Sequence, residues 1–177
     1  PYDEDHPTNP LSPYGVSKLV SEQYARVYNE IYGLLTVAFR YFTVYRLSRA
    51  NASGLDPEAV HGDGTQTRDF TYIEDIVRVN EQLLEDDSAD GEILNVGSTD
   101  NIDIRTLAEV IRDEIALSLL EYDEVREGDA EHTHADISKA NNVLGYEPTV
   151  DIRDGVSKFI DWYRENQAWY DPLVRSS

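Results

Sequence analysis

An almost unbroken run of apolar, β-branched and aromatic residues at positions 34–45 constrains the fold of this chain most. The run reads Leu-Leu-Thr-Val-Ala-Phe-Arg-Tyr-Phe-Thr-Val-Tyr and shows little alternation between polar and apolar positions. A strand with one solvated face would alternate, so the run predicts a strand buried on both faces, as in a parallel sheet. Such a sheet needs helices to cover it, and the chain is therefore expected to be an α/β protein.

A long helix is predicted before this strand. Ser12 fits its N-cap, Pro13 its first turn and Gly33 its end, which are the residue types favoured at these places. Apolar residues recur at spacings of one, three and four, so the helix is amphipathic. These residues are Val16, Leu19, Val20, Tyr24, Val27, Tyr28 and Ile31.

Shorter elements are predicted after the strand. Residues 46–58 have no periodicity and indicate a loop. Thr71 and Glu74 have the spacing of a capping box for a helix at about 74–86. The remaining predicted elements are strands at 92–96 and 119–122 and helices at 105–117, 138–144 and 152–165, with Gly145 ending the second of these helices and Asp151 capping the third.

The charge balance narrows the class of partner. The chain has 35 acidic and 15 basic residues, a formal net charge of −20. Such a surface repels nucleic acid and anionic membranes, so neither is expected as a partner. It also repels itself, and salt screens that repulsion. The composition is typical of a salt-adapted, halophilic protein; the alternative is an ordinary acidic protein that needs no salt.

The chain contains no cysteine, which excludes disulfides and thiolate metal sites. No apolar run has the length of a membrane span, and no segment resembles a secretion signal. These features predict a soluble cytoplasmic protein. No metal site is expected, because His132 and His134 have no further ligand cluster near them in the sequence.

Tyr14 and Lys18 are the sharpest candidate for chemistry. They are four residues apart on the predicted helix and so share a face. A free tyrosine has a pKa of about 10, and a nearby ammonium favours its phenolate form. The pair is therefore a candidate proton shuttle beside a sugar hydroxyl. With 12 tyrosines and 3 lysines, chance gives about 0.2 such pairs, so the spacing alone is weak evidence.

The surrounding sequence strengthens that interpretation. Five blocks stand out in order along the chain: Asn9–Lys18, Arg40–Tyr45, Gly62–Asp75, Asn95–Gly97, and Arg126–Asp129 followed by Ala135–Ala140 and Leu144–Pro148. These blocks resemble segments of the NAD-dependent epimerase/dehydratase family of extended short-chain dehydrogenases/reductases, in particular UDP-glucose and UDP-glucuronate 4-epimerases. The resemblance covers nearly the whole chain except 46–58.

The resemblance implies a role for each of six residues. Tyr14 would be the catalytic acid/base, and Lys18 would bind the nicotinamide ribose and tune Tyr14. Tyr41 would lie near the nicotinamide of NAD, and Thr43 by the sugar. Arg68 and Arg126 would clamp the diphosphate of a UDP-sugar, a role that suits guanidinium groups. Judged without the family, the two arginines are more simply explained as surface ion-pair partners.

The chain departs from the family pattern in two places. The glycine-rich phosphate loop that holds NAD would lie upstream of Pro1, together with the catalytic Ser or Thr. Gly62 and Gly64 do not replace that loop, because no third glycine and no strand–turn–helix pattern surround them. The segment after Tyr45 is also shorter than in relatives and lacks their Gly-Pro, so the resemblance does not define part of the sugar pocket.

The expected fold is part of a Rossmann-type doubly wound parallel sheet plus a small α/β substrate-binding domain, without the N-terminal NAD-binding half. Residues 1–45 would supply late Rossmann elements with the active-site helix, and 59–177 mainly the substrate-binding domain. The expected function is nucleotide-sugar 4-epimerisation by transient NAD-dependent oxidation, in an enzyme that is a homodimer at full length. A sugar-nucleotide dehydratase or decarboxylase, and a truncated inactive remnant, are the alternatives; the chain alone is expected to be inactive.

Overall fold

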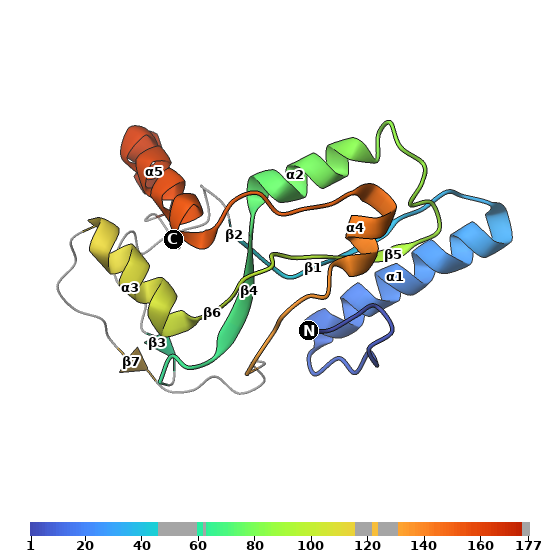
Figure 1. Cartoon of the computed structure of the whole chain (residues 1–177), viewed down its shortest axis with the longest axis horizontal. Helices are drawn as coiled ribbons and strands as arrows, with labels where there is room; N and C mark the ends of the chain where they lie inside the picture. Colours follow the sequence, from blue (N-terminus) through green and yellow to red (C-terminus); the bar gives the residue numbers. More distant parts are fainter. Residues whose placement is uncertain (46–59, 62, 116–121, 124–130, 175–177) are drawn as a thin grey trace.

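The computed structural model describes residues 1–45, 60–61, 63–115, 122–123 and 131–174. They form an α/β fold in which short strands lie between helices (Figure 1). The helices are α1 (Pro13–Tyr32), α2 (Ile73–Gln82), α3 (Ile104–Ile115), α4 (Ser138–Leu144) and α5 (Ile152–Val174). The strands are β1 (Ala38–Tyr41), β2 (Thr43–Tyr45), β3 (Val60–His61), β4 (Thr67–Tyr72), β5 (Ile93–Val96), β6 (Asn101–Asp103) and β7 (Tyr122–Asp123).

Strands β1 and β5 form a parallel pair with helices on both faces. Their register places Ala38 beside Ile93 and Tyr41 beside Val96. Arg40 points to α1, where it pairs with Glu22, whereas the neighbouring Tyr41 bonds to Asn80 of α2. Successive side chains of a strand point to opposite faces, so α1 covers one face and α2 the other (Figure 1).

A second sheet has the order β2–β4–β6, and β4 pairs parallel with β2 and antiparallel with β6. The prediction of one strand through 34–45 is therefore wrong. The chain leaves the first sheet at Phe42, and β1 and β2 take different partner strands. The expected burial is also wrong, because the residues of β1 and β2 are half-buried or exposed. In the described part of the chain, β1 has β5 as its single partner.

Helix ends follow local sequence signals in α1, α4 and α5. The Ser12 side chain accepts a hydrogen bond from the Gly15 amide, and Gly33 and Gly145 end their helices with left-handed φ angles of 63° and 64°. The Asp151 carboxylate accepts from the first amides of α5, which extends further than predicted. Residues 46–58, and most of the strand predicted at 119–122, lie outside the described residues.

The predicted capping box of α2 is wrong. The helix begins at Ile73 with Tyr72 as its N-cap, and no side chain caps it. The Thr71 hydroxyl instead donates to the Asp69 carboxylate at 3.2 Å. A strand therefore runs directly into the helix, and the side chain that looked like a cap belongs to the interior of β4.

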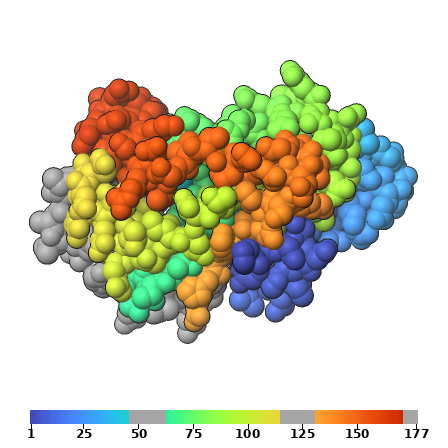
Figure 2. Space-filling view, in the orientation of Figure 1, coloured from blue at the N-terminus to red at the C-terminus, as the bar shows by residue number. Residues whose placement is uncertain are grey.

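Two hydrophobic clusters form the core. The larger one joins α2, α4 and β5, with Val79, Leu94 and Val96 at its centre. The smaller one joins α3 and α5 through Val110, Val156 and Ile160. Helix α1 contributes no buried residue to either cluster, and its C-terminal end lies at one edge of the molecule (Figure 2).

Candidate functional site

Tyr14 and Lys18 lie in the first turns of α1, which the Ser12 cap and Pro13 place at the start of the helix. The Lys18 Nζ atom is 5.2 Å from the centre of the Tyr14 ring. The spacing predicted from the sequence thus brings ammonium and phenol together on one face. The Tyr14 side chain is 71% exposed, so its hydroxyl is open to a ligand from outside.

Helix α1 is held in a fixed rotation against β1. Arg40 donates through Nε to Glu22 Oε2 at 2.7 Å and through a terminal nitrogen to Glu22 Oε1 at 2.9 Å, a bidentate pair that is largely buried. It also donates to the Glu4 carbonyl. These contacts with Glu22 raise the pKa of Arg40 above its usual value in spite of burial. The pair sets which way the face with Tyr14 and Lys18 points.

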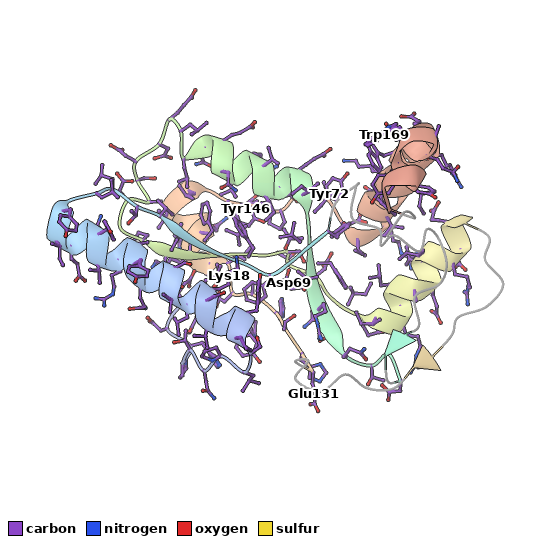
Figure 3. All side chains as sticks on the ribbon, turned by 180° about the vertical axis from the view of Figure 1, so that it is seen from behind. Lys18, Asp69, Tyr72, Glu131, Tyr146 and Trp169 are labelled. Atoms are coloured by element: carbon purple, nitrogen blue, oxygen red, sulfur yellow. The ribbon has the colours of Figure 1, made fainter. Side chains whose placement is uncertain are left out.

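The Tyr41 side chain does not join this face. Its hydroxyl exchanges hydrogen bonds with the Asn80 amide group at 2.8–3.0 Å, on the α2 side of the sheet. Burial there raises the pKa of Tyr41. Lys18 is on α1, across the sheet from α2 (Figure 3). The Tyr41 and Tyr14 side chains therefore lie on different sides of the sheet and do not act together in this arrangement. The role of Tyr41 beside the nicotinamide stays a prediction.

Thr43 and Arg68 lie on one face of the second sheet. Thr43 is in register with Phe70, and Arg68 precedes Phe70 by two residues on β4, so the three side chains share a side. The Arg68 guanidinium donates to the Thr67 and Glu131 carbonyls at 2.9 and 3.4 Å. No carboxylate of the described residues forms an ion pair with it. Arg126 lies outside the described residues.

Two buried aspartates were not singled out from the sequence. Asp69 and Asp75 are 0% and 1% exposed. Asp69 accepts from the Ser98 and Ala135 amides at 2.6 and 3.0 Å. Asp75 accepts from Thr149 and pairs with Arg78. Both stand in the block that resembles the family signature, but nothing in that pattern reveals that the carboxylates face inward.

A polar hollow of about 550 Å³ lies elsewhere, between α4 and the turn after β5. Its lining includes Thr99, Ser138, Asn141, Asn142 and Glu147. Of the residues assigned to the site from the sequence, none that the structure describes lines it. No group of three or more potential metal ligands occurs among the described residues.

A family model described as GDP-mannose 4,6 dehydratase matches residues 1–159. The chain belongs to this family. The resemblance to the epimerase/dehydratase family and the expected fold class are both confirmed. The solved neighbours are Rossmann-type epimerases and dehydratases with TM-scores of 0.82–0.86. The division into regions at about residue 45 stays a prediction, as do the roles of the individual site residues.

Relatives of the family include a putative UDP-glucose 4-epimerase of Methanocaldococcus jannaschii, 35% identical over 94% of this chain and 58% of the relative. The UDP-glucuronate 4-epimerase of Thermodesulfobacterium geofontis is 36% identical over 94% of this chain and 55% of its own. The chain thus spans a little over half the length of these curated relatives.

Solved neighbours include an epimerase and a dehydratase. The UDP-glucuronic acid 4-epimerase of Bacillus cereus, in complex with UDP-glucuronic acid and NAD, superposes with a TM-score of 0.82 at 35% identity, covering 92% of this chain and 55% of its own. The dTDP-glucose 4,6-dehydratase DesIV of Streptomyces venezuelae, with NAD bound, has a TM-score of 0.86 at 28% identity, covering 97% and 57%.

Proposed function

We propose that this chain supplies the catalytic helix and the substrate-binding part of a UDP-sugar 4-epimerase that acts by transient NAD-dependent oxidation at C4. The observation that carries the proposal is the Tyr14–Lys18 pair, with the ammonium 5.2 Å from the ring centre at the exposed start of α1. The similarity to epimerases of UDP-glucose and UDP-glucuronate supports this choice of substrate class.

The proton chemistry is assigned to Tyr14. Its phenolate oxygen would take the proton of the sugar 4-hydroxyl and return it at the end of the reaction. The Lys18 ammonium, one turn away on the same face, would stabilise the phenolate by its charge. The Arg40–Glu22 pair would keep this face oriented, because a proton transfer needs its partners within hydrogen-bond reach.

Tyr14 and Lys18 fit one end of NAD. A phenol and an ammonium on one exposed helix face suit the hydroxyl groups of the nicotinamide ribose. NAD, when bound, supplies the acceptor and donor of the hydride. The glycine-rich loop that holds the pyrophosphate in Rossmann folds is not in this sequence. We therefore expect the 177-residue chain by itself to bind NAD only weakly and to be inactive.

The substrate diphosphate is assigned to Arg68, together with Arg126, and the sugar to Thr43. The Arg68 guanidinium donates hydrogen bonds to two carbonyl groups and has no carboxylate partner among the described residues. A guanidinium also supplies a local positive charge that attracts a diphosphate in a chain of net charge −20, where most of the surface repels it.

The exposed apolar side chains of helix α1 also support a homodimer. Val16, Val20, Tyr24, Tyr28 and Ile31 are between 45% and 66% exposed along this one helix. A continuous apolar stripe of this kind marks an interaction surface, and an antiparallel pairing of two α1 helices would cover it. No helix in the described part of the chain is long and apolar enough to span a membrane. A cytoplasmic location is kept as part of this proposal; the chain contains no cysteine and so has no disulfide that would indicate an oxidising compartment.

Dehydration of a sugar nucleotide is the second candidate, favoured by the family model and by the likeness to DesIV. Product analysis separates the two. The longest natural polypeptide that contains this chain is incubated with NAD and UDP-glucose or UDP-glucuronate, and the sugar nucleotides are identified by NMR. A C4 epimer is expected. A 4-keto sugar that has lost water would establish a dehydratase, and no conversion of either sugar nucleotide would contradict the proposed epimerase and favour a catalytically inactive remnant.

A further inference from the structure

The buried Asp69 carboxylate holds together three segments that are far apart in the sequence. It lies on β4, and it accepts from the Ser98 amide after β5 at 2.6 Å and from the Ala135 amide at 3.0 Å. The Thr71 hydroxyl supplies a third hydrogen bond. No cation of the described residues pairs with Asp69. Its charge is therefore balanced by main-chain dipoles, which fixes the position of the backbone around it.

Gly97 shows how closely the three segments approach at this point. A Cβ atom on Gly97 would lie 2.7 Å from the Asp69 Oδ2 atom and 2.5 Å from the Ala135 Cβ atom. The Gly97 carbonyl accepts from the buried Tyr146 hydroxyl at 2.8 Å. Asp69 and Tyr146 both lie near the middle of the molecule (Figure 3). A single methyl group would push these segments apart.

The segment anchored at Ala135 also holds Arg68. It runs beside β4, since the Thr67 amide donates to the Glu131 carbonyl at 2.9 Å and the Thr133 amide donates to the Thr67 carbonyl at 3.1 Å. The Arg68 guanidinium donates to the same Glu131 carbonyl. In the sequence, Arg126 precedes Glu131 by only five residues. The segment that Asp69 anchors thus contacts Arg68 and follows Arg126 in the sequence.

We propose that Asp69 is a positioning residue for the diphosphate site, which acts by fixing the 131–135 segment against β4 so that Arg68 is held toward the substrate. The proposal rests on the assignment of Arg68 to the diphosphate. It predicts that loss of the Asp69 charge weakens recognition of phosphate groups specifically, and not recognition of the nucleoside.

Asp75 provides the matched control. It is equally buried, stands six residues later on the start of α2, and likewise accepts main-chain and hydroxyl donors, from the Thr149 amide and hydroxyl and the Val150 amide. It differs from Asp69 in that it also pairs with Arg78. It anchors Thr149 and Val150, where no site residue has been placed. If Asp69 only stabilised the fold, Asp69→Asn and Asp75→Asn would have the same consequences for ligand binding.

The test measures UDP and uridine affinities of the 177-residue chain by NMR titration, with melting temperatures recorded beside them. Arg68→Ala should weaken UDP binding about ten- to a hundredfold, the effect of losing one charged hydrogen bond, and Asp69→Asn about tenfold. Uridine affinity should be unchanged in both variants. Asp75→Asn should lower the melting temperature and leave both affinities unchanged. Thr71→Val keeps the Asp69 carboxylate and removes one hydrogen-bond donor to it, so it should weaken UDP binding about two- to fivefold. If Asp69→Asn does not fold, this variant tests the positioning role of Asp69.

The outcomes separate this inference from the function on which it rests. If Arg68→Ala weakens UDP binding but Asp69→Asn and Thr71→Val do not, the positioning role is wrong and the diphosphate assignment stands. If Asp69→Asn weakens UDP and uridine alike, Asp69 acts on the fold alone. If Arg68→Ala has no effect, or the unmodified chain does not bind UDP, both the diphosphate assignment and the role of Asp69 are overturned.

Discussion

The two helices on either side of the β1–β5 pair differ sharply in what they bury. Helix α2 has 10 residues and buries Asp75, Ile76 and Val79. Helix α1 has 20 residues and buries none. The apolar side chains of α2 enter the core under α4 and the Leu144–Tyr146 turn, whereas many of those of α1 remain exposed.

This difference separates packing from chemistry. An apolar stripe that stays exposed contributes little to the stability of this chain and is available for a partner. The same helix holds Tyr14 and Lys18 at its accessible start. The α2 side should therefore determine stability, and the α1 side should determine association and turnover.

Two isoleucines give the largest expected contrast in stability. Ile76 on α2 is 7% exposed and Ile31 on α1 is 66% exposed. Ile76→Ala should lower the free energy of unfolding by about 2–5 kcal/mol through the lost burial and the cavity. Ile31→Ala should change it by less than about 0.5 kcal/mol. Urea unfolding of both variants measures the difference, and equal losses would refute the division between the two helices.

Arg68 and Arg78 test whether residues that bind substrate can be separated from residues that stabilise the fold. Arg68→Ala should raise the Michaelis constant for a UDP-sugar about ten- to a hundredfold, since a charged hydrogen bond to the diphosphate is lost. Arg78 pairs with Asp75 and donates to the Thr149 hydroxyl, so Arg78→Ala should lower the melting temperature and leave the constant unchanged. Kinetics use the longest natural polypeptide that contains this chain. A Michaelis constant unaffected by Arg68→Ala would remove Arg68 from the site.

Salt should act on the whole surface and not on one helix. At a net charge of −20, screening over about 3 Å in 1 M salt removes most surface repulsion. The melting temperature is expected to rise by about 5–10 °C between 0.1 and 2 M potassium chloride, and equally for the Ile31→Ala variant. Melting temperatures that stay level or fall with salt would mean that the acidic surface is not a salt adaptation.

The smallest expected effect concerns alkaline pH. Tyr146 on the α2 side is 3% exposed, and burial, with Asp75 and Asp69 nearby, raises the pKa of its hydroxyl. Stability from the protonated phenol is complete below the unfolded pKa of about 10 and is lost as pH rises above it, because only the unfolded chain can ionise there. Tyr146→Phe should flatten this loss in unfolding measured from pH 9 to 11. Tyr24→Phe, at a 62% exposed position, should leave the slope as it is.

Local signals in the sequence predicted the ends of α1 and α4 and the Tyr14–Lys18 pair, because caps and four-residue spacings act within one or two turns. Partner choice between strands depends on distant segments, so the change of sheet at Phe42 was not predicted. The inward-facing carboxylates of Asp69 and Asp75 were missed for the same reason. Their donors, at Ser98, Ala135 and Thr149, come from elsewhere in the chain.

The most direct test of the account compares two tyrosines of α1 by turnover. Tyr14 and Tyr24 are both exposed, at 71% and 62%, so replacing either by Phe should leave folding intact. Assays use NAD, a UDP-sugar and the longest natural polypeptide that contains this chain. Tyr14→Phe should lower kcat by about 10²–10⁴-fold through the lost proton transfer, with the Michaelis constant nearly unchanged, while Tyr24→Phe retains full kcat. Near-normal turnover in the Tyr14→Phe variant would contradict the assignment of Tyr14 as the acid/base.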